Sequence, residues 1–363
     1  MNRPVDLMRP EVLAQPAYAV PESAGMIKLD AMENPYAWPG ELHSAWLEAL
    51  GGVELNRYPD AGARALTAAI RAAHHVPEEA GCLLGNGSDE LIQILISAVQ
   101  ASRRPVLSPV PTFVMYEALA RAAGVPFVGV PLTADFDLDG TALLQAIEEY
   151  RPALVFLAFP NNPTGRLYEP GLVAEVAAAN PGLTVIDEAY APFSSHSFLS
   201  RVGGTPGLMV MRTMSKLGLA GLRLGYLAAT REWIDALDRL RLPYNINALT
   251  QRSVSFALAH AGVLDEQARL LREQRARVSA ALISLPAVHR VIPSGANFIL
   301  FEVARGRGHP VFELLRASGI LIKDVGRAGG VLTDHLRVTV GTPDENSTFL
   351  TALARALGSG ESR

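Results

Sequence analysis

Short apolar runs alternate with longer helix-like segments from about residue 82 to residue 230. Strand-length runs lie at 106–108, 126–130, 154–159, 183–186, 208–211 and 224–228. Helix-like segments lie between them at 89–100, 116–123, 141–149 and 170–179. The runs rarely alternate with polar residues, which is typical of strands buried on both faces. This order predicts an α/β fold with a doubly wound, mostly parallel sheet.

The pattern changes after residue 232. Helical character continues at 234–242 and 251–285, and short strands at 298–302 and 336–340 flank a helix at 311–317. This α+β pattern predicts a smaller second domain. We therefore expect an N-terminal arm (1–40), a large domain (41–246) and a small C-terminal domain (247–363). The proline-rich arm is expected to be extended and to pack on the small domain or on a partner.

Composition and charge narrow the class of protein. Hydrophobic residues make up 49% of the chain and charged residues 19%, which indicates a folded protein with an ordinary core. The net charge is -4 and no dense basic run occurs, which argues against a nucleic-acid partner. Residues 1–20 lack a signal-peptide pattern and no apolar stretch reaches membrane length, so we expect a cytoplasmic protein. Cys82 is the single cysteine and the histidines are scattered, so no metal site is expected.

Lys216 is the strongest chemical signal in the chain. It follows the apolar run 208–211 and precedes the glycine-rich turn 218–221, whereas most lysines are solvated surface residues. Asp187 ends another apolar run, and a carboxylate there is costly unless a cation or strong donors face it. Together with Ser215 and Arg223, these residues suit pyridoxal 5′-phosphate (PLP). The lysine forms the Schiff base, the aspartate pairs with the pyridine nitrogen, and the hydroxyl and arginine hold the phosphate.

Two turns add to this hypothesis, although each has a simpler explanation. The run Gly85-Asn86-Gly87-Ser88-Asp89-Glu90 precedes a predicted helix, whose free N–H groups could bind an anion, but Ser88 could also be a plain helix cap. Asn161 to Gly165 is a good turn sequence. It also follows a predicted parallel strand, where open α/β sheets place their ligands.

In this order, the motifs resemble the fold-type-I PLP-dependent aminotransferases and, within them, the histidinol-phosphate aminotransferase family. The resemblance covers nearly the whole chain. It rests on Glu33-Asn34-Pro35-Tyr36, Asn56-Arg57-Tyr58-Pro59, Gly87-Ser88-Asp89-Glu90, Pro111-Thr112-Phe113, Asn161 to Gly165, Asp187-Glu188-Ala189-Tyr190, Ser215-Lys216, Gly221-Leu222-Arg223, Ala296-Asn297-Phe298 and Leu336 to Gly341.

The resemblance implies a role for each matching residue. Lys216 would carry PLP and move the substrate proton, and Asp187 would keep the pyridine nitrogen protonated. Asn162 and Tyr190 would contact the phenolic oxygen, and Phe113 would stack on the ring. The phosphate would be held by Gly87, Ser88, Asp89, Thr213, Ser215 and Arg223. Tyr58 would reach the cofactor of a second copy of the chain, which implies a homodimer.

Substrate roles follow from the same resemblance. Arg337 would bind the carboxylate of glutamate or 2-oxoglutarate, and Tyr36 and Asn297 would contact the substrate. Lys323 stands where the family has an arginine near the substrate phosphate; it or Arg327 would bind that phosphate, although either could simply be solvated. The spacing from Lys216 to Arg223 is seven residues, whereas many members have eight, and Gly218 and Gly221 could absorb the difference.

The implied reaction converts L-histidinol phosphate and 2-oxoglutarate to imidazole-acetol phosphate and L-glutamate, a step of histidine biosynthesis. An aromatic amino acid aminotransferase and a threonine-phosphate decarboxylase remain open, because substrate side chains are read by variable loops. A PLP-dependent transcription regulator is disfavoured, since no helix-turn-helix pattern precedes Met26. A PLP-binding protein without activity is disfavoured by the complete set of Lys216, Asp187 and Arg223.

Overall fold

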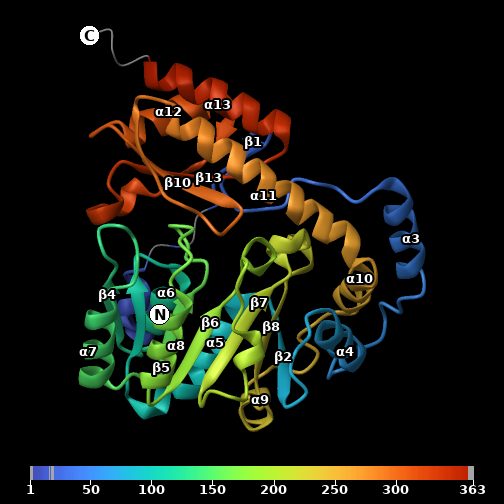
Figure 1. Ribbon diagram of the computed structural model, residues 1–363. Coiled ribbons are helices and arrows are strands. Elements are labelled where there is room, and N and C mark those ends of the chain that lie inside the picture. The colour runs from blue at the N-terminus through green and yellow to red at the C-terminus, as the bar shows by residue number, and fades with distance from the viewer. Residues whose placement is uncertain (1–2, 16, 18–19, 359–363) are drawn as a thin grey trace.

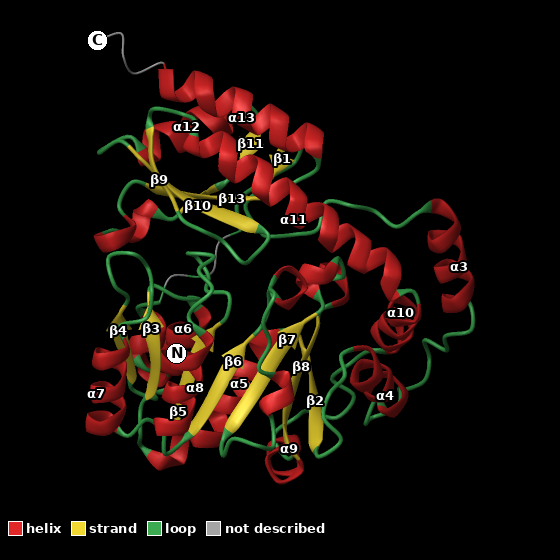
Figure 2. Ribbon diagram, in the orientation of Figure 1, coloured by secondary structure: helices red, strands yellow, loops and turns green. Residues whose placement is uncertain are grey.

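The computed structural model describes residues 3–15, 17 and 20–358. A large sheet with its helices forms one part of the molecule, and a smaller sheet beneath two long helices forms the other (Figure 1). Coloured by secondary structure, the two sheets are separate, and loops at one end of the large sheet face the small one (Figure 2). No helix in the described ranges is long and apolar enough to cross a membrane.

The large sheet has seven strands. In spatial order they are β2 (Ala80–Asn86), β8 (Leu224–Thr230), β7 (Leu208–Thr213), β6 (Leu183–Asp187), β5 (Leu154–Ala158), β3 (Val106–Val110) and β4 (Phe127–Pro131). Strand β8 runs antiparallel to both neighbours, and all other pairs are parallel. The mostly parallel sheet is therefore confirmed. The sequence did not predict β2 as a strand, because Gly81 and Gly85 weaken its apolar pattern.

Helices cover both faces of this sheet. Along β5, Leu154 and Phe156 belong to the core cluster formed with α5 (Ser88–Val99), α6 (Met115–Ala123) and α9 (Arg231–Asp238). The alternate residues Val155 and Leu157 belong to the cluster formed with α7 (Gly140–Tyr150) and α8 (Pro170–Ala179). Side chains alternate between faces along a strand, so both faces are buried. The doubly wound architecture is confirmed, and the four predicted helices begin within one residue of the observed starts.

The smaller sheet is antiparallel. Its order is β12 (Lys323–Asp324), β13 (His335–Thr339), β10 (Phe298–Val303) and β9 (Val288–Val291). Three helices pack around it, namely α11 (Ala261–Ile283), α12 (Gly308–Ala317) and α13 (Pro343–Gly358). Beside it, β1 (Ile27–Lys28) pairs in parallel with β11 (Ile320–Leu321), so the N-terminal arm joins this part of the fold.

The helical region that joins the two parts of the fold is divided in a way that the sequence did not predict. The region 251–285 is helical as predicted, but it consists of two helices, α10 (Ala248–Ala259) and α11, with a break at His260. Helix α10 packs on α3 (Gly40–Leu50) and α4 (Arg64–Ala73), whereas α11 packs on the small sheet. The two directions of packing explain why the chain bends there. The domain boundary at 246/247 stays a prediction.

The N-terminal arm is not extended throughout, contrary to the prediction. It contains two short helices, α1 (Pro4–Leu7) and α2 (Pro10–Leu13), each beginning with a proline. Proline is favoured in the first helical turn, so the prolines that indicated an extended arm begin these helices. Helix α2 packs on α6 of the large sheet, where Arg9 Nη2 donates to the carbonyl oxygen of Arg121 at 3.1 Å.

Candidate active site

The candidate active site lies at the carboxyl ends of the parallel strands. Asp187 is the last residue of β6, and Lys216 lies in a 3₁₀ turn shortly after β7. These residues face a cavity of about 370 Å³, whose other wall is the N-terminal segment Ala31–Glu33. The predicted cofactor residues that line it are Ser88, Asp89, Phe113, Asn162, Asp187, Tyr190, Thr213, Ser215, Lys216 and Arg223.

The carboxylate of Asp187 is buried and held by two donors. Its Oδ2 accepts a hydrogen bond from the Tyr116 hydroxyl at 2.5 Å, and its Oδ1 accepts one from the Ala189 N–H at 3.0 Å. Burial raises the pKa of Asp187 to about 6, although both hydrogen bonds oppose that rise. A cationic partner such as a protonated pyridine nitrogen would satisfy this carboxylate. The sequence analysis missed Tyr116, because nothing in a helical tyrosine indicates which strand end it faces.

The amine of Lys216 is enclosed by the same cavity. Its Nζ donates to the carbonyl oxygen of Ala31 at 3.0 Å, so the N-terminal arm contacts the lysine directly. Burial lowers the pKa of Lys216 to about 8, and the nearby positive charges of Arg337 and Arg223 act in the same direction. A substantial fraction of the amine is therefore neutral near physiological pH, as attack on an aldehyde requires.

A cradle for a phosphate lies at the start of α5. Gly87 has φ +80°, a conformation that favours glycine, and a Cβ atom there would lie 2.6 Å from Arg223 Nη2 and displace that guanidinium. Arg223 Nη1 donates to Ser215 Oγ at 3.5 Å, and Thr213 Oγ1 bonds the same oxygen at 3.0 Å. Arg223 Nη2 lies 3.6 Å from Asp89 Oδ2. The guanidinium, the hydroxyls and the first N–H groups of the helix suit a phosphate group.

The seven-residue connection from Lys216 to Arg223 contains two residues with positive φ, and Arg223 still reaches the phosphate cradle. Gly218 has φ +115°, as expected for a glycine that absorbs a tight turn, whereas Gly221 does not have a positive φ. Arg223 itself has φ +49°. This left-handed conformation is unusual for a residue with a side chain. The tighter turn is thus accommodated at Gly218 and at Arg223.

Arg337 is buried beside the cavity. Its Nη1 donates to Asn162 Oδ1 at 2.5 Å, and its Nη2 donates to the carbonyl oxygen of Asp30 at 2.9 Å. The guanidinium carbon lies 5.2 Å from the centre of the Phe298 ring, within the range of a cation–π contact. Arg337 therefore connects the small sheet, the N-terminal arm and the turn after β5.

The N-terminal arm contributes more to the site than the sequence indicated. Met32 N–H donates to Thr339 Oγ1 at 3.0 Å, and Asn297 Nδ2 donates to the Met32 carbonyl oxygen at 3.1 Å. Asn34 Nδ2 donates to Gln267 Oε1 at 2.9 Å. These contacts hold residues 31–34 across the cavity. The sequence of this segment does not predict these contacts, because most of the contacts are made by its backbone atoms.

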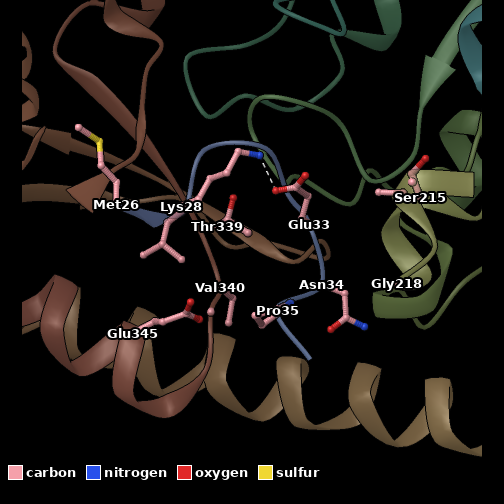
Figure 3. Close-up of a pocket in the computed structure, with 14 residues that line it drawn as sticks. Met26, Lys28, Glu33, Asn34, Pro35, Ser215, Gly218, Thr339, Val340 and Glu345 are labelled. Atoms are coloured by element: carbon pink, nitrogen blue, oxygen red, sulfur yellow. Dashed lines mark hydrogen bonds and ion pairs between the residues drawn. The ribbon is translucent and has the colours of Figure 1, made fainter. Parts of the chain in front are cut away.

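A second cavity of about 390 Å³ adjoins the first on the other side of this segment. Figure 3 shows Lys28 reaching across to Glu33, with Ser215 and Gly218 on the large-domain side and Glu345 on the small-domain side. Glu33 and Ser215 line both cavities. Glu33 also favours the charged form of Lys216 through its negative charge.

Six predicted site residues do not line the first cavity, namely Gly87 and Arg337, described above, and Tyr36, Asn297, Tyr58 and Lys323. Tyr36 packs on the small-domain core, and the buried Asn297 bonds the arm. Tyr58 is 80% exposed and stacks on Tyr244, with ring centres 4.4 Å apart. Lys323 lies opposite Arg337 in the register of β12 and β13.

Arg327 has local partners. Its Nε lies 3.4 Å from Asp324 Oδ2, and its Nη2 lies 3.6 Å from Glu313 Oε1. These contacts account for Arg327 without a ligand. Within the described ranges, no group of three or more histidine, cysteine, aspartate and glutamate residues could hold a metal ion.

Comparison with known proteins identifies the enzyme class to which this chain belongs. The family model for aminotransferases of class I and II matches residues 24–353. The fold is that of a crystal structure of histidinol-phosphate aminotransferase from Sinorhizobium meliloti in complex with PLP, with a TM-score of 0.87, 23% identity, and coverage of 97% of this chain and 98% of that one. The chain belongs to the class I and II aminotransferases, whose fold-type-I architecture and PLP cofactor it shares.

Full-length relatives narrow this assignment. The chain is 50% identical to histidinol-phosphate aminotransferase 2 of Nitrosococcus oceani, covering 97% of this chain and 98% of the relative. It is 49% identical to histidinol-phosphate aminotransferase of Chromobacterium violaceum, covering 96% and 97%. Within its class, the chain is a member of the histidinol-phosphate aminotransferase family. The predicted family, fold and cofactor are confirmed.

Proposed function

We propose that this chain transfers an amino group between L-histidinol phosphate and 2-oxoglutarate, giving imidazole-acetol phosphate and L-glutamate in histidine biosynthesis. The observation that carries the proposal is the arrangement of Lys216 and Asp187, an amine and a carboxylate of shifted pKa facing one cavity beside a phosphate cradle. The names and full-length similarity of the relatives support the choice of substrate.

Each residue of the site has a task that follows from its position. Bound PLP supplies an electron sink for the charge left on a substrate carbon that loses its proton. Asp187 would accept a hydrogen bond from the pyridine nitrogen and keep it protonated. Lys216 Nζ would bind the cofactor's aldehyde carbon and, once displaced by the substrate amine, would move the proton. Its pKa of about 8 suits proton transfer near neutral pH.

The two substrates carry different anionic groups, and the site offers cations for both. Arg337, oriented by its bonds to Asn162 and Asp30, would bind the carboxylate of glutamate or 2-oxoglutarate through a guanidinium fork. Lys323 would bind the phosphate of histidinol phosphate as a point charge. Its place opposite Arg337 supports this role, whereas Arg327 is paired with Asp324.

We propose further that the chain acts as a homodimer in which Tyr58 reaches the cofactor phosphate of the other subunit. Tyr58 lies in the loop between α3 and α4, stacked on Tyr244, and 80% of its surface is exposed in the single chain. A stacked, exposed aromatic pair is well suited to a subunit contact, because it presents a flat apolar surface with a hydroxyl at its edge.

A half-reaction with the holoenzyme tests the substrate. Histidinol phosphate, L-phenylalanine or threonine phosphate is added alone, and the absorption of the cofactor is followed. We expect histidinol phosphate to convert the cofactor to its amine form and 2-oxoglutarate to restore it. A faster reaction with phenylalanine would favour the aromatic aminotransferase, and release of carbon dioxide from threonine phosphate would favour the decarboxylase.

Comparison with dephosphorylated histidinol isolates the phosphate contact. A charge-assisted contact of about 1.5–3 kcal/mol predicts that kcat/KM falls by roughly 10- to 150-fold without the phosphate. Equal values for the two compounds would contradict recognition of a phosphate ester.

A further inference from the structure

A third cavity lies in a groove between the large and small sheets, lined by residues other than those of the cofactor cavity. Its volume is about 600 Å³. The polar residues that line it are Arg166, Arg272, Arg275, Ser194, Ser195 and Ser294. None of its lining residues within the described chain is acidic.

The three arginines come from opposite walls of the groove. Arg272 and Arg275 lie three positions apart on α11, so their side chains are on one face of the helix. Arg166, from the loop before α8, lies on the other wall and is paired with Asp137 at 2.6 Å. No ion pair joins Arg272 or Arg275 to a carboxylate among the described residues.

Arg272 and Arg275 are already held in place by backbone oxygens. Arg272 Nη1 donates to the Pro192 carbonyl oxygen at 2.6 Å, and Arg275 Nη1 donates to the Ala296 carbonyl oxygen at 2.7 Å. A guanidinium has five N–H donors, so each arginine keeps donors for a ligand. Burial and the neighbouring charge of Arg272 lower the pKa of Arg275. An anion between the two charges would relieve this repulsion.

We propose that this groove binds a small metabolite through a phosphate or carboxylate group held by Arg272 and Arg275. Guanidinium forks match the oxygen geometry of both groups, and the serine hydroxyls add donors of the right kind. The volume is in the range of small-molecule sites. This proposal concerns a second site and goes beyond the proposed transamination.

The wall of this groove is hydrogen-bonded to segments that also approach the cofactor cavity. The Gly295 N–H donates to the Gly165 carbonyl oxygen at 2.7 Å, which joins the groove to the turn that carries Asn162. Arg275 bonds the carbonyl of Ala296, the residue before Asn297. A ligand held by α11 and by the loop at Arg166 would link the two parts of the fold.

Binding is measured with inorganic phosphate and succinate as separate probes on the PLP-loaded enzyme. Crystals soaked in tungstate, a phosphate mimic with a strong anomalous signal, locate the site. Calorimetry compares the wild type with the double variant Arg272→Gln/Arg275→Gln. The matched control is Arg277→Gln, because Arg277 is exposed on the same helix and does not line the groove.

We expect an anomalous peak between Arg272 and Arg275 in the wild type and in the control. The double variant should lose the peak and bind the preferred probe at least about tenfold more weakly at the groove, because charge-assisted contacts are lost. Preference between phosphate and succinate identifies the ligand's anionic group. Calorimetry also detects anions bound at Arg337 or Lys323, so the located peak decides. Absence of the peak from the wild type, or its persistence in the double variant, would overturn the proposal.

A conservative variant separates binding from folding. Arg272→Lys keeps a donor for the Pro192 carbonyl and removes the guanidinium fork, so it should fold and still bind the probe more weakly. Wild-type-like binding in this variant, together with intact binding in Arg275→Lys, would also overturn the proposal. Because the peak and the variants concern residues that do not line the cofactor cavity, their failure leaves transamination of histidinol phosphate untouched, and the reverse also holds.

Discussion

Lys323 lies directly opposite Arg337 across the antiparallel strands β12 and β13. Opposed residues of such a pair project on one face with Cβ atoms about 4.5–5.5 Å apart, and like charges there destabilise the sheet. The pair therefore places two cations side by side at the edge of the candidate site. A substrate anion that binds there would offset their repulsion.

The first prediction concerns Lys323. Lys323→Gln should lower kcat/KM for histidinol phosphate by roughly 10- to 150-fold, because a charge-assisted phosphate contact is lost. Arg327→Gln is the control and should change kcat/KM little, since Arg327 pairs with Asp324 and Glu313. Steady-state kinetics of both variants decide the question. A loss confined to Arg327→Gln would assign the phosphate to Arg327, and equal losses would mean that both residues contribute to its binding.

The second prediction concerns capture of PLP by Lys216. Only the neutral amine attacks the aldehyde, and the pKa of Lys216 is lowered to about 8. The rate of covalent capture by the apoenzyme should therefore rise about tenfold per pH unit below pH 8 and level off above it. Stopped-flow absorbance measures this rate. Borohydride reduction and peptide mapping should place the label on Lys216, and label on another lysine would refute the assignment.

The third prediction concerns the stability of the apoenzyme. The folded-state pKa of Asp187 is raised to about 6, so the folded protein binds more protons than the unfolded chain between pH 4 and 6. Burial of the carboxylate thus destabilises the fold above pH 6, and this cost falls as the pH is lowered. Relative to Asp187→Asn, the wild-type apoenzyme should gain about 1 kcal/mol in unfolding free energy from pH 7 to pH 5. If the difference in unfolding free energy between wild type and Asp187→Asn were the same at pH 5 and pH 7, the raised pKa of Asp187 would be disproved.

The fourth prediction concerns Tyr116 as a residue that positions Asp187. Tyr116→Phe removes the donor to Asp187 Oδ2, so the pKa of Asp187 should rise further and the stability midpoint should move to higher pH. Loss of a hydrogen bond to a charged group, about 1.5–3 kcal/mol, should lower kcat roughly 10- to 150-fold. Tyr168→Phe is the control, because Tyr168 is equally buried but makes no bond to Asp187. Equal effects of both variants on the pH midpoint would indicate a packing role only.

The fifth prediction concerns the proposed subunit contact of Tyr58. Mixing inactive Lys216→Ala chains with Tyr58→Phe chains should give hybrid dimers in which one site is wild type at both positions. Activity should therefore recover above that of either parent. The control is Tyr244→Phe, which keeps the ring that stacks on Tyr58. Mixing it with Lys216→Ala should not raise activity above that of Tyr244→Phe alone. An active monomer in sedimentation would contradict the shared site.

Much of the large domain could be predicted because its strands are buried on both faces. Apolar runs such as 154–159 and 183–186 have no polar alternation, and the turns after them carry the chemistry. The small domain was harder to predict, since β12 has two residues and α10 and α11 form one helical pattern broken only at His260. The break arises because the two helices pack on different parts of the fold. Such long-range packing cannot be predicted from the local sequence pattern.

The site was predicted where a residue type has a characteristic task, as with Lys216 and Asp187. The assigned roles of individual residues stay predictions. Tyr116 and Ala31 were missed for different physical reasons. Tyr116 acts through the geometry of a helix packed on the sheet, and Ala31 acts through its backbone carbonyl, which every residue possesses.

The contacts of the N-terminal arm have a consequence for synthesis of the protein. The carbonyl oxygen of Asp30 bonds Arg337, and Met32 bonds Thr339, in each case across 307 positions of the chain. Contacts so distant in sequence form late, because a long loop must close before they are made. The chain must therefore leave the ribosome as far as Thr339 before the wall over Lys216 is complete, so synthesis of the large domain alone does not form the site.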